Sequence, residues 1–534
     1  ITPRHLKITA VFAAVASAIL FAGINLNPAD QPPITVAPYA LKSFDLAPNG
    51  TKAYRPWYEN GAWQGDLIEY DICYNDADPD CGDGQRRTDA QVGSNPPVAG
   101  TNNWMARATF AQKEDPEGDG TYTDYWQQKT GGRHIFTFDG TDQVDFIWGK
   151  LNDEQQQALD IEAFNSGGNS SDMLDFIRGD HSNERTFGGP YRIRFSLLGD
   201  IINSWPVYLG APKESLNIAG FRTFDNEQAN RKGHIFVGAN DGMLHAFNEE
   251  DGSEAWAYIP SMLIVDPADP YQKDDLGNTM TDADGNPIIK TSKLRKLAAV
   301  PYIHTYYVDG QLTVTSAQRS GTWISALAGG LGAGGKGMYI LDVTSDDPQT
   351  DKVLFELTGK KFGHIYGRPR IARRAIEATD KTVTYPWYVI AGNGYGSDDG
   401  KAELLIISLD DGTVQSILAS DGGAVADGLS APVLVDATGN LAADFAFAGD
   451  TNGDMWKFNL NKLGEKPKKI FDGNANQPIT TAPTVGRHPA GGYMVYFGTG
   501  SVTSLADARD ESTQQRLVAV WDSAPAGVTD MVEH

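Results

Sequence analysis

Residues 436–444, with the sequence DATGNLAAD, place oxygen-bearing groups at alternate positions. Calcium takes about six to eight hard oxygen ligands, and an EF-hand-like loop supplies them from positions 1, 3, 5, 7 and 9. Here those positions hold two carboxylates, a hydroxyl, an amide and a backbone carbonyl, from Asp436, Thr438, Asn440, Ala442 and Asp444. The spacing therefore predicts a Ca²⁺ site in a tight loop.

Two residues of this segment depart from the pattern of a calcium loop. Position 3 is Thr438 rather than Asp, and position 6 is Leu441, where the pattern has a glycine for a sharp bend. The alternative is a metal-free hairpin with Asx-turns, in which Asp and Asn side chains bond to their own backbone. Apolar runs at 433–435 and 445–448 predict the strands that hold the loop.

The two cysteines of the chain, Cys73 and Cys81, flank a short acidic stretch. In an oxidising compartment this arrangement favours a disulfide between them. Closing so small a loop contributes roughly 2–3 kcal/mol in the chain-entropy model. Two free thiols, or a pair of metal ligands, are the alternatives.

The beginning of the sequence predicts export. Basic residues precede an apolar run at 8–24, as in a secretory signal. The run is short for a membrane span of ~20 residues, which favours a cleaved signal over an uncleaved anchor. We therefore expect a signal-like segment over residues 1–26 and a proline-rich leader or linker over residues 27–50.

Composition restricts the class of partner. The chain has 534 residues and a formal net charge of −25, which repels phosphate backbones and argues against a nucleic-acid partner. Hydrophobic residues make up 40% of the chain, enough to build a core. The 58 glycines and 28 prolines indicate many turns.

One structural unit recurs after residue 50. A short β-branched or aromatic strand is followed by an Asp-Gly or Asn-Gly turn and then by another strand. Segments that contain strands of this kind are 234–260, 337–343, 403–418, 444–460 and 492–500. Helical patterns are few, at 151–164 and 171–177. Hairpins at such intervals predict an all-β β-propeller over 51–534, with short helical insertions near the N-terminus; an array of β-sandwiches is the alternative.

Two short motifs have simpler explanations than ligand binding. Gly330-x-Gly332-x-x-Gly335 is followed by an apolar strand rather than a helix, which predicts an inter-strand loop and not a dinucleotide site. The RGD tripeptide Arg178–Asp180 follows the predicted helix, where Gly179 can serve as the C-terminal stop. Receptor binding through this tripeptide is the alternative.

The sequence shows no local signature of a catalytic site. No serine–histidine–aspartate set, metal-binding histidine pair or paired-carboxylate motif stands out. The histidines His234, His245 and His364 lie in or beside predicted strands, where a structural role is the default. The segment 246–260 resembles the blade motif of quinone-dependent dehydrogenases, so a periplasmic quinoprotein dehydrogenase of the PQQ type is an alternative function.

Several stretches together resemble the propeller of the PilY family of type IV pilus assembly and tip-adhesin proteins. They occur in the family's order over roughly residues 63–522. The stretches are LLGDIINSWPVYLG (197–210), FVGANDGMLHAFNEEDGSEAWAYIP (236–260), GGLGAGGKGMYILDVT (329–344), AGNGYGSDDGKAELLIISLDDG (391–412), GLSAPVLVDATGNLAADFAFAGDTNGDMWKFNL (428–460) and PITTAPTVGRHPAGGYMVYFGTG (478–500). The stretch FIRGDHSNE (176–184) also matches the family, which weakens a dedicated receptor role for its RGD.

The resemblance implies an exported, non-enzymatic protein of the type IV pilus tip. It implies a β-propeller of about seven blades, with the last blades expected to be missing here, because family members usually continue well beyond residue 523. It also implies partnership with minor pilins, a role in assembly, in opposing retraction and in twitching motility, and adhesion to host or abiotic surfaces. The resemblance implies that the protein is located in the periplasm, at the outer membrane and on the cell surface. The family's calcium loop falls on the same five positions of 436–444. A generic secreted propeller scaffold remains a further alternative.

Overall fold

The computed structural model describes residues 40–41, 51–59, 64–72, 104–110, 113–114, 122–123, 132–160, 171–194, 196–212, 216–282, 285–350, 352–420, 422, 426–501, 513–523 and 531–533. The predicted signal segment and both cysteines lie outside these residues, as does all of the leader except residues 40–41. The described chain falls into two compact units. One comprises the described residues of Ala37–Leu312 with Leu341–Thr358, and the other comprises those of Thr313–Ile340 with Gly359–His534.

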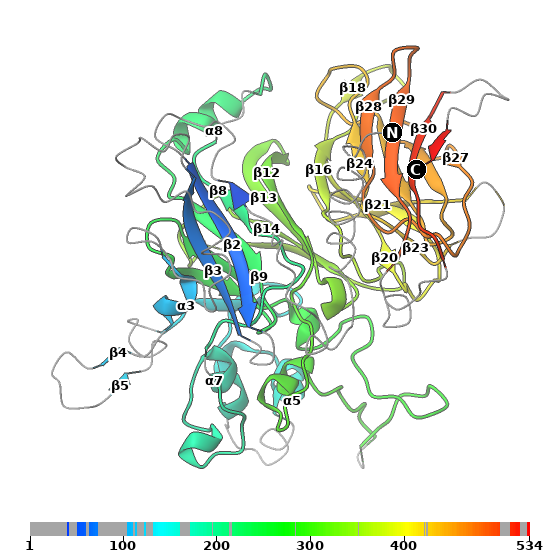
Figure 1. The fold of residues 1–534 in the computed structure, drawn as a ribbon. Helices are drawn as coiled ribbons and strands as arrows, with labels where there is room; N and C mark the ends of the chain where they lie inside the picture. Colours follow the sequence, from blue (N-terminus) through cyan, green and yellow to red (C-terminus); the bar gives the residue numbers. More distant parts are fainter. Residues whose placement is uncertain are drawn as a thin grey trace, which may run out of the picture. The chain divides into compact units, whose positions relative to one another are not determined.

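The first unit is built on a six-stranded sheet of order β7-β6-β11-β10-β9-β8. Figure 1 labels two of its strands, β8 and β9. Its strands are β6 (Ile135–Phe138), β7 (Gln143–Asp145), β8 (Val207–Leu209), β9 (His234–Gly238), β10 (Leu244–Asn248) and β11 (Glu254–Tyr258). Neighbouring strands are antiparallel except β11 and β6, which run parallel. A separate three-stranded sheet consists of β1 (Ala40–Leu41), β2 (Thr51–Glu59) and β3 (Gln64–Ile72). A two-stranded ribbon consists of β4 (Lys113–Glu114) and β5 (Tyr122–Thr123).

Apolar side chains from both of these sheets form one core. Tyr54 and Leu67 of the three-stranded sheet are fully buried together with Ile235, Val237 and Phe247 of the six-stranded sheet. The β9–β10 hairpin turns at an Asp-Gly pair, where Gly242 has a φ of 98° that L-residues seldom adopt. This predicted turn therefore aligns the strands that carry the core residues.

Within the described residues the helices are short and belong to the first unit, apart from one 3₁₀ turn. They are α3 (Ala106–Thr109), α5 (Asp153–Leu159), α7 (Asp172–Arg178) and α8 (Phe221–Glu227), and the 3₁₀ turns η3 (Trp148–Lys150), η4 (Arg185–Phe187), η5 (Ser261–Leu263), η6 (Lys293–Ala298) and η7 (Gly332–Gly334). Helix α5 begins with a capping box between Asn152 and Gln155. It occupies only part of the predicted 151–164, and residues 161–170 lie outside the described chain. Helix α7 matches the prediction and ends at Gly179, with a φ of 123°.

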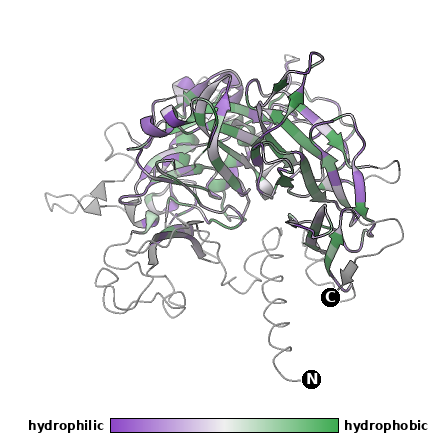
Figure 2. Cartoon of the chain, turned by 90° about the horizontal axis from the view of Figure 1, so that it is seen from above, coloured by the Kyte–Doolittle hydropathy of each residue, from purple (hydrophilic) through white to green (hydrophobic). Residues whose placement is uncertain are grey.

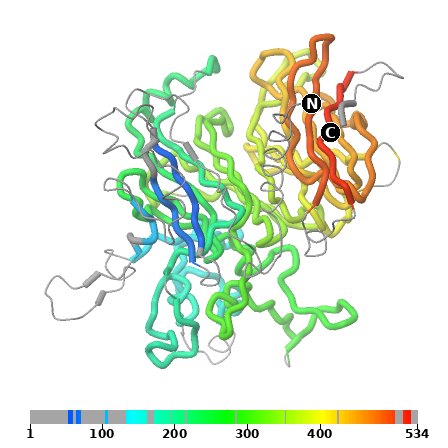
Figure 3. Tube along the Cα trace, viewed as in Figure 1, coloured from blue at the N-terminus to red at the C-terminus, as the bar shows by residue number. Residues whose placement is uncertain are grey.

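The second unit contains consecutive four-stranded antiparallel meanders, which Figure 3 follows from yellow to red. One is β16 (Arg370–Arg373), β19 (Trp387–Gly392), β21 (Glu403–Ser408) and β22 (Val414–Leu418). The next is β24 (Val433–Val435), β25 (Phe445–Gly449), β26 (Met455–Asn459) and β27 (Lys468–Phe471). The last is β28 (Thr484–Arg487), β29 (Tyr493–Gly498), β30 (Leu517–Trp521) and β31 (Met531–Glu533). Such meanders are the blade unit of a β-propeller.

Shorter ribbons and one further sheet complete the described strands. The ribbons pair β17 (Ile376–Glu377) with β18 (Val383–Thr384), and β20 (Gly394–Tyr395) with β23 (Gly428–Leu429). A four-stranded sheet has the order β12 (Leu312–Arg319), β13 (Thr322–Gly330), β14 (Met338–Asp342) and β15 (Val353–Leu357). The glycine-rich motif at 329–337 connects β13 to β14, which confirms an inter-strand loop.

The meander β24–β27 buries apolar residues on both of its faces. One cluster joins Leu404 and Ile406 of β21 to Ala446, Trp456 and Phe458 of the following meander. Another lies between that meander and the last one. Figure 2 shows the hydrophobic colour concentrated along the strands and the hydrophilic colour mainly on loops and helices. Burial of this kind, meander against meander, is what blade-like packing requires.

No helix within the described residues is both long enough and apolar enough to cross a membrane.

Candidate functional site

The predicted calcium segment closes the hairpin between β24 and β25. These strands are antiparallel, and Val435 pairs with Phe445 directly next to the loop. The prediction that strands flank residues 436–444 is therefore confirmed. Because both strands belong to a packed meander, the two ends of the loop are held at a fixed separation.

Asp436 organises the loop by accepting hydrogen bonds from successive backbone N–H groups. Its Oδ1 lies 3.1 Å from the nitrogen of Thr438, 2.6 Å from that of Gly439 and 3.3 Å from that of Asn440. Its Oδ2 accepts from the nitrogen of Leu441 at 2.8 Å. Partial burial acts to raise the pKa of Asp436, but these N–H groups outweigh it and hold the pKa below its usual value. The carboxylate is therefore charged at neutral pH.

Asp444 closes the loop from the other end and is buried. Its Oδ2 accepts hydrogen bonds from the nitrogens of Ala437, at 2.8 Å, and Thr438, at 3.1 Å. Its Oδ1 accepts from Nδ2 of Asn461 at 2.8 Å. Both carboxylates thus point into the same turn, although seven residues separate them along the chain.

Thr438 lies between the two carboxylates. Its Oγ1 is 3.4 Å from Oδ1 of Asp436 and 3.3 Å from Oδ2 of Asp444. The structure therefore brings three of the five predicted ligands together. Of the other two, Asn440 uses its Oδ1 to accept a hydrogen bond from the nitrogen of Ala442 at 2.9 Å, which leaves the carbonyl of Ala442 out of this bond.

The loop makes its sharp bend without a glycine at position 6. Leu441 has a φ of 62°, in the left-handed region, and its side chain is 48% exposed. Such a backbone costs an L-residue about 1–2 kcal/mol. The departure from the calcium pattern at Leu441 therefore leaves the shape of the loop intact and adds strain to it.

The guanidinium of Arg373, from β16, holds the outside of this bend. Its Nη2 donates to the carbonyl of Asn440 at 2.5 Å, and its Nε donates to the carbonyl of Leu441 at 3.1 Å. These two hydrogen bonds, from an arginine on a separate strand to successive carbonyls, fix the strained residue Leu441 in place. The loop is thus shaped in advance by its own carboxylates and by a neighbouring strand.

The hydrogen bonds of the loop match those of the metal-free alternative, while its oxygen atoms match the ligand preference of Ca²⁺. Carboxylate, hydroxyl and amide oxygens are hard ligands, and two carboxylates lie within 3.4 Å of one hydroxyl. In the described part of the chain no group of three or more His, Cys, Asp or Glu side chains is arranged to hold a metal ion. A cation at this loop would therefore be held by few charges.

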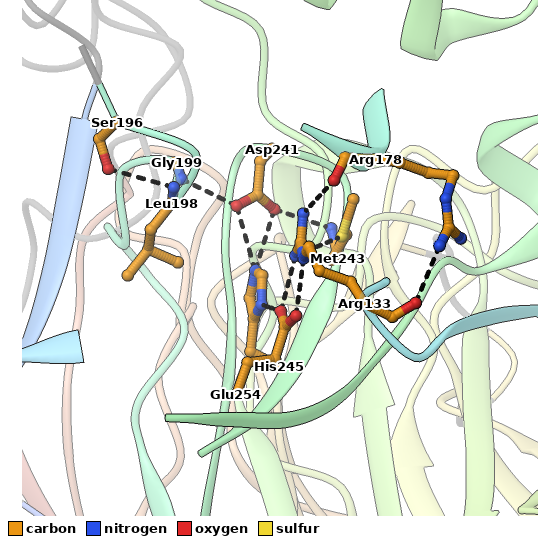
Figure 4. A network of polar contacts seen from close by, with 9 residues as sticks. All are labelled: Arg133, Arg178, Ser196, Leu198, Gly199, Asp241, Met243, His245 and Glu254. Atoms are coloured by element: carbon orange, nitrogen blue, oxygen red, sulfur yellow. Dashed lines mark hydrogen bonds and ion pairs between the residues drawn. The ribbon is translucent and has the colours of Figure 1, made fainter. Parts of the chain in front are cut away.

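A second polar cluster is formed by residues in the strands of the six-stranded sheet and next to them (Figure 4). It was not predicted from the sequence. Arg133 binds Glu254 in a bidentate pair, with Nε to Oε2 at 2.7 Å and Nη2 to Oε1 at 2.6 Å. His245 is fully buried between two carboxylates: its Nδ1 is 2.8 Å from Oε1 of Glu254, and its Nε2 is 3.1 Å from Oδ2 of Asp241. With the imidazole protonated, two positive charges balance two negative charges.

The protonation of His245 follows from these contacts. Burial acts to lower its pKa, but Asp241 and Glu254 outweigh burial and raise it to about 9. Only the sequence position of His245 in a strand suggested the structural role that we expected for it. The two carboxylates that contact the imidazole come from the β9–β10 turn and from β11. No local sequence pattern indicated that Arg133 would join them.

The RGD tripeptide is not available as an extended receptor ligand. Arg178 is buried, and its guanidinium donates to the carbonyls of Phe146 and Arg133, both at 2.9 Å. Asp180 instead caps the following turn by accepting from the nitrogen and hydroxyl of Ser182. The tripeptide is therefore the C-terminal stop of α7, as its position after the predicted helix indicated.

Comparison with known proteins identifies a family and relatives to which this chain is similar. The family model described as the PilY1 beta-propeller domain matches residues 198–532, a range that contains the loop 436–444. The Type IV pilus biogenesis factor PilY1 of Pseudomonas aeruginosa strain PAK is 34% identical over 429 residues, covering 72% of this chain and 33% of the relative. A homolog from Xylella fastidiosa strain Temecula1 is 32% identical over 413 residues, covering 68% of this chain and 25% of the relative.

A solved structure gives a similar level of identity. The crystal structure of the Pseudomonas aeruginosa PilY1 C-terminal domain is 31% identical and covers 60% of this chain and 65% of that chain, with a TM-score of 0.45. The chain spans about a third or less of the length of the curated relatives described above. The family match confirms both the all-β propeller class and the resemblance on which the sequence prediction relied.

Proposed function

This chain belongs to the PilY1 β-propeller family, and on that premise we propose that it is a non-enzymatic, calcium-binding protein of the type IV pilus tip. The observation that carries the proposal is the family match over residues 198–532. In this role the exported protein supports pilus assembly with minor pilins, opposes retraction, and contributes to twitching motility and to adhesion to host or abiotic surfaces. It acts at the outer membrane and the cell surface.

Calcium binding is assigned to the loop between β24 and β25. Asp436, Thr438 and Asp444 would hold the ion with side-chain oxygens, and Asn440 and the carbonyl of Ala442 would complete the set. Bound Ca²⁺ would supply the positive charge that the two converging carboxylates lack. The fit rests on an all-oxygen donor set and on the left-handed bend at Leu441, which shapes the loop as a calcium loop needs.

The expected affinity is low. Extracellular calcium modules commonly have Kd of ~10⁻⁴–10⁻³ M, and only two of the five ligands here are carboxylates, so we expect the weak end of that range. At a free Ca²⁺ concentration about ten times Kd, binding stabilises the folded chain by roughly 1.4 kcal/mol. A metal-filled loop would stiffen one blade, so its occupancy could alter the contact between the tip and the growing pilus.

Isothermal titration of the whole chain with CaCl₂ tests the metal site. We expect a saturable heat that is lost in Asp436→Ala and in Asp444→Ala. Asp411→Ala is the matched control, because Asp411 caps a hairpin turn through the nitrogen of Thr413 and lies outside the candidate calcium loop. Equal, flat traces for wild type and Asp436→Ala would leave only the metal-free turn.

Deletion of the gene tests the pilus function separately. We expect surface pili to disappear in the deletion strain and to return when retraction is also disabled. Complementation with wild type and with Asp436→Ala then distinguishes a calcium-dependent role from a calcium-independent one. Normal piliation and twitching in a clean deletion with no paralogue would contradict the pilus role itself.

A further inference from the structure

The described residues of 269–290, in the first unit, form an arm that is held in shape by its own hydrogen bonds. A bridge joins Tyr271 to Ile289 at its base. The pattern Asp-x-x-Gly-Asn occurs twice along the arm, at 274–278 and 282–286. In both copies Oδ1 of the aspartate accepts a hydrogen bond from the nitrogen of the asparagine, at 2.8 Å and 2.9 Å. The shape of the arm therefore comes from contacts within it.

The outer part of the arm presents apolar side chains next to negative charge. Residues 273–282 are all exposed, and Leu276 is 87% exposed. Met280 is also exposed. Asp274 and Asp275 directly precede Leu276, and the hydrogen bonds that Asp274 accepts hold its pKa below the usual value. The arm thus offers an acidic surface with a leucine at its centre.

A second surface of the first unit has the opposite charge. It consists of the segments 184–194 and 292–304, and we call it the basic surface. The nitrogen of Arg192 donates to the carbonyl of Ala298 at 3.1 Å, and its guanidinium lies 4.2 Å from the centre of the Tyr302 ring. The two segments therefore lie side by side.

The basic surface also exposes large apolar side chains. Phe187 is 65% exposed and Ile303 is 76% exposed. Two smaller apolar residues are exposed with them, Ile193 and Val300. Scattered single apolar residues are normal on a protein surface, whereas a group of them on adjoining segments is typical of an interaction site.

Positive charge accompanies these apolar residues. Arg185 and Lys296 are exposed, and Arg295 is half-buried. Glu184 is the one acidic residue in the sequence of the two segments; it is buried and accepts a hydrogen bond from Nε of Arg194 at 2.7 Å. A chain with 69 acidic and 44 basic residues thus concentrates positive charge at this surface.

We propose that the arm of one copy of this chain binds the basic surface of a second copy. Each side has exposed apolar residues that the other can cover, and their charges are opposite. Leu276 and Phe187 are both exposed in the single chain, so the arm does not cover the basic surface of its own copy. Every copy carries both features, and the arm ends only a few residues before η6, which is part of the basic surface. Two copies related by a two-fold axis can therefore exchange arms reciprocally.

Sedimentation velocity of the whole chain at rising protein concentration tests this association. The buffer contains EGTA, so that Ca²⁺ does not bridge carboxylates of different copies. We expect an equilibrium between monomer and dimer that shifts toward monomer as NaCl is added, because salt screens the opposite charges. Leu276→Ser and Phe187→Ser should each raise the Kd of the dimer by about tenfold or more, because each removes an apolar side chain from the interface.

Charge reversal tests whether the arm and the basic surface meet directly. Asp275→Lys and Lys296→Glu should each weaken the dimer, because each places a like charge opposite the partner. The double variant Asp275→Lys/Lys296→Glu should associate more tightly than either single variant, since opposite charges face each other again. A merely structural effect of the two substitutions would not be reversed in this way.

Val383→Ser is the matched control, because Val383 is an exposed apolar residue on β18 in the other unit. Its Kd should equal that of wild type. The proposal is overturned if the chain stays monomeric at every concentration, or if a dimer forms that Leu276→Ser, Phe187→Ser and Lys296→Glu leave unchanged. Co-sedimentation of a monomeric chain with vesicles of phosphatidylcholine and phosphatidylglycerol would also overturn it, because the basic surface would then bind a membrane instead.

Discussion

Replacing His245 with glutamine should change how the stability of the protein depends on pH. His245 is fully buried between Asp241 and Glu254, and its protonated ring balances their charges together with Arg133. Glutamine has a similar length and can donate one hydrogen bond, but it carries no charge. The substitution therefore removes the titration while keeping a polar side chain in the site.

The expected magnitude follows from the pKa of the native imidazole. A native pKa of about 9, against 6.5 for an unperturbed histidine, corresponds to about 3 kcal/mol of unfolding free energy. Below pH 6.5 both the folded and the unfolded chain carry the proton, so this stabilisation is fully present. Between pH 6.5 and 9 only the folded chain keeps the proton, so stability falls by about 1.4 kcal/mol per pH unit.

Chemical denaturation at a series of pH values from 6 to 9.5, followed by tryptophan fluorescence, measures the effect. Other groups also titrate in this range, among them Asp309, whose pKa burial raises to about 7, and Lys293 and Lys352, whose pKa values burial lowers to about 8. The informative quantity is therefore the difference in slope between wild type and His245→Gln. His488→Gln, a histidine stacked on Trp521 at 4.3 Å, is the control.

We expect wild type and the control to lose about 3 kcal/mol more than His245→Gln between pH 6.5 and 9. The variant should also be less stable than wild type at pH 6, because Asp241 and Glu254 then lose the positive charge of the imidazole between them. Parallel pH profiles for all three proteins would show that His245 is neutral in the folded state, and the charge balance proposed for this cluster would be wrong.

Three further substitutions test other parts of the structure, each by the midpoint of denaturant unfolding. Leu441→Gly should stabilise the chain by up to about 1 kcal/mol in the absence of Ca²⁺, because glycine adopts the φ of 62° without strain. A loss of stability would show that the backbone of Leu441 is not strained. Gly392→Ala should cost about 2 kcal/mol or more, because its Cβ would lie 2.0 Å from the carbonyl of Ser430, whereas exposed Gly464→Ala, with open space around its Cβ, should be nearly neutral. Glu254→Gln should cost about 3–5 kcal/mol by leaving its arginine buried without a counter-charge, and a cost below 1 kcal/mol would show that the pair is dispensable.

Features with local causes were predictable from the sequence. The hairpin strands around 436–444, the stop of α7 at Gly179 and the glycine-rich loop between β13 and β14 all depend on residues a few positions apart. Turn chemistry and side-chain alternation act over that distance, so they can be recognised in one sequence. The ligand positions of the candidate calcium loop were found in the same way, from spacing alone.

Features that depend on distant residues appeared only in the tertiary structure. Arg133 meets Glu254 across 121 residues, and that contact, together with Asp241, determines whether His245 carries a charge. The left-handed backbone of Leu441 is held by an arginine from another strand, which the loop sequence does not contain. Charge state, strain and pairing depend on which groups the fold brings within a few ångströms, whereas hairpins and helix ends depend on neighbours along the chain.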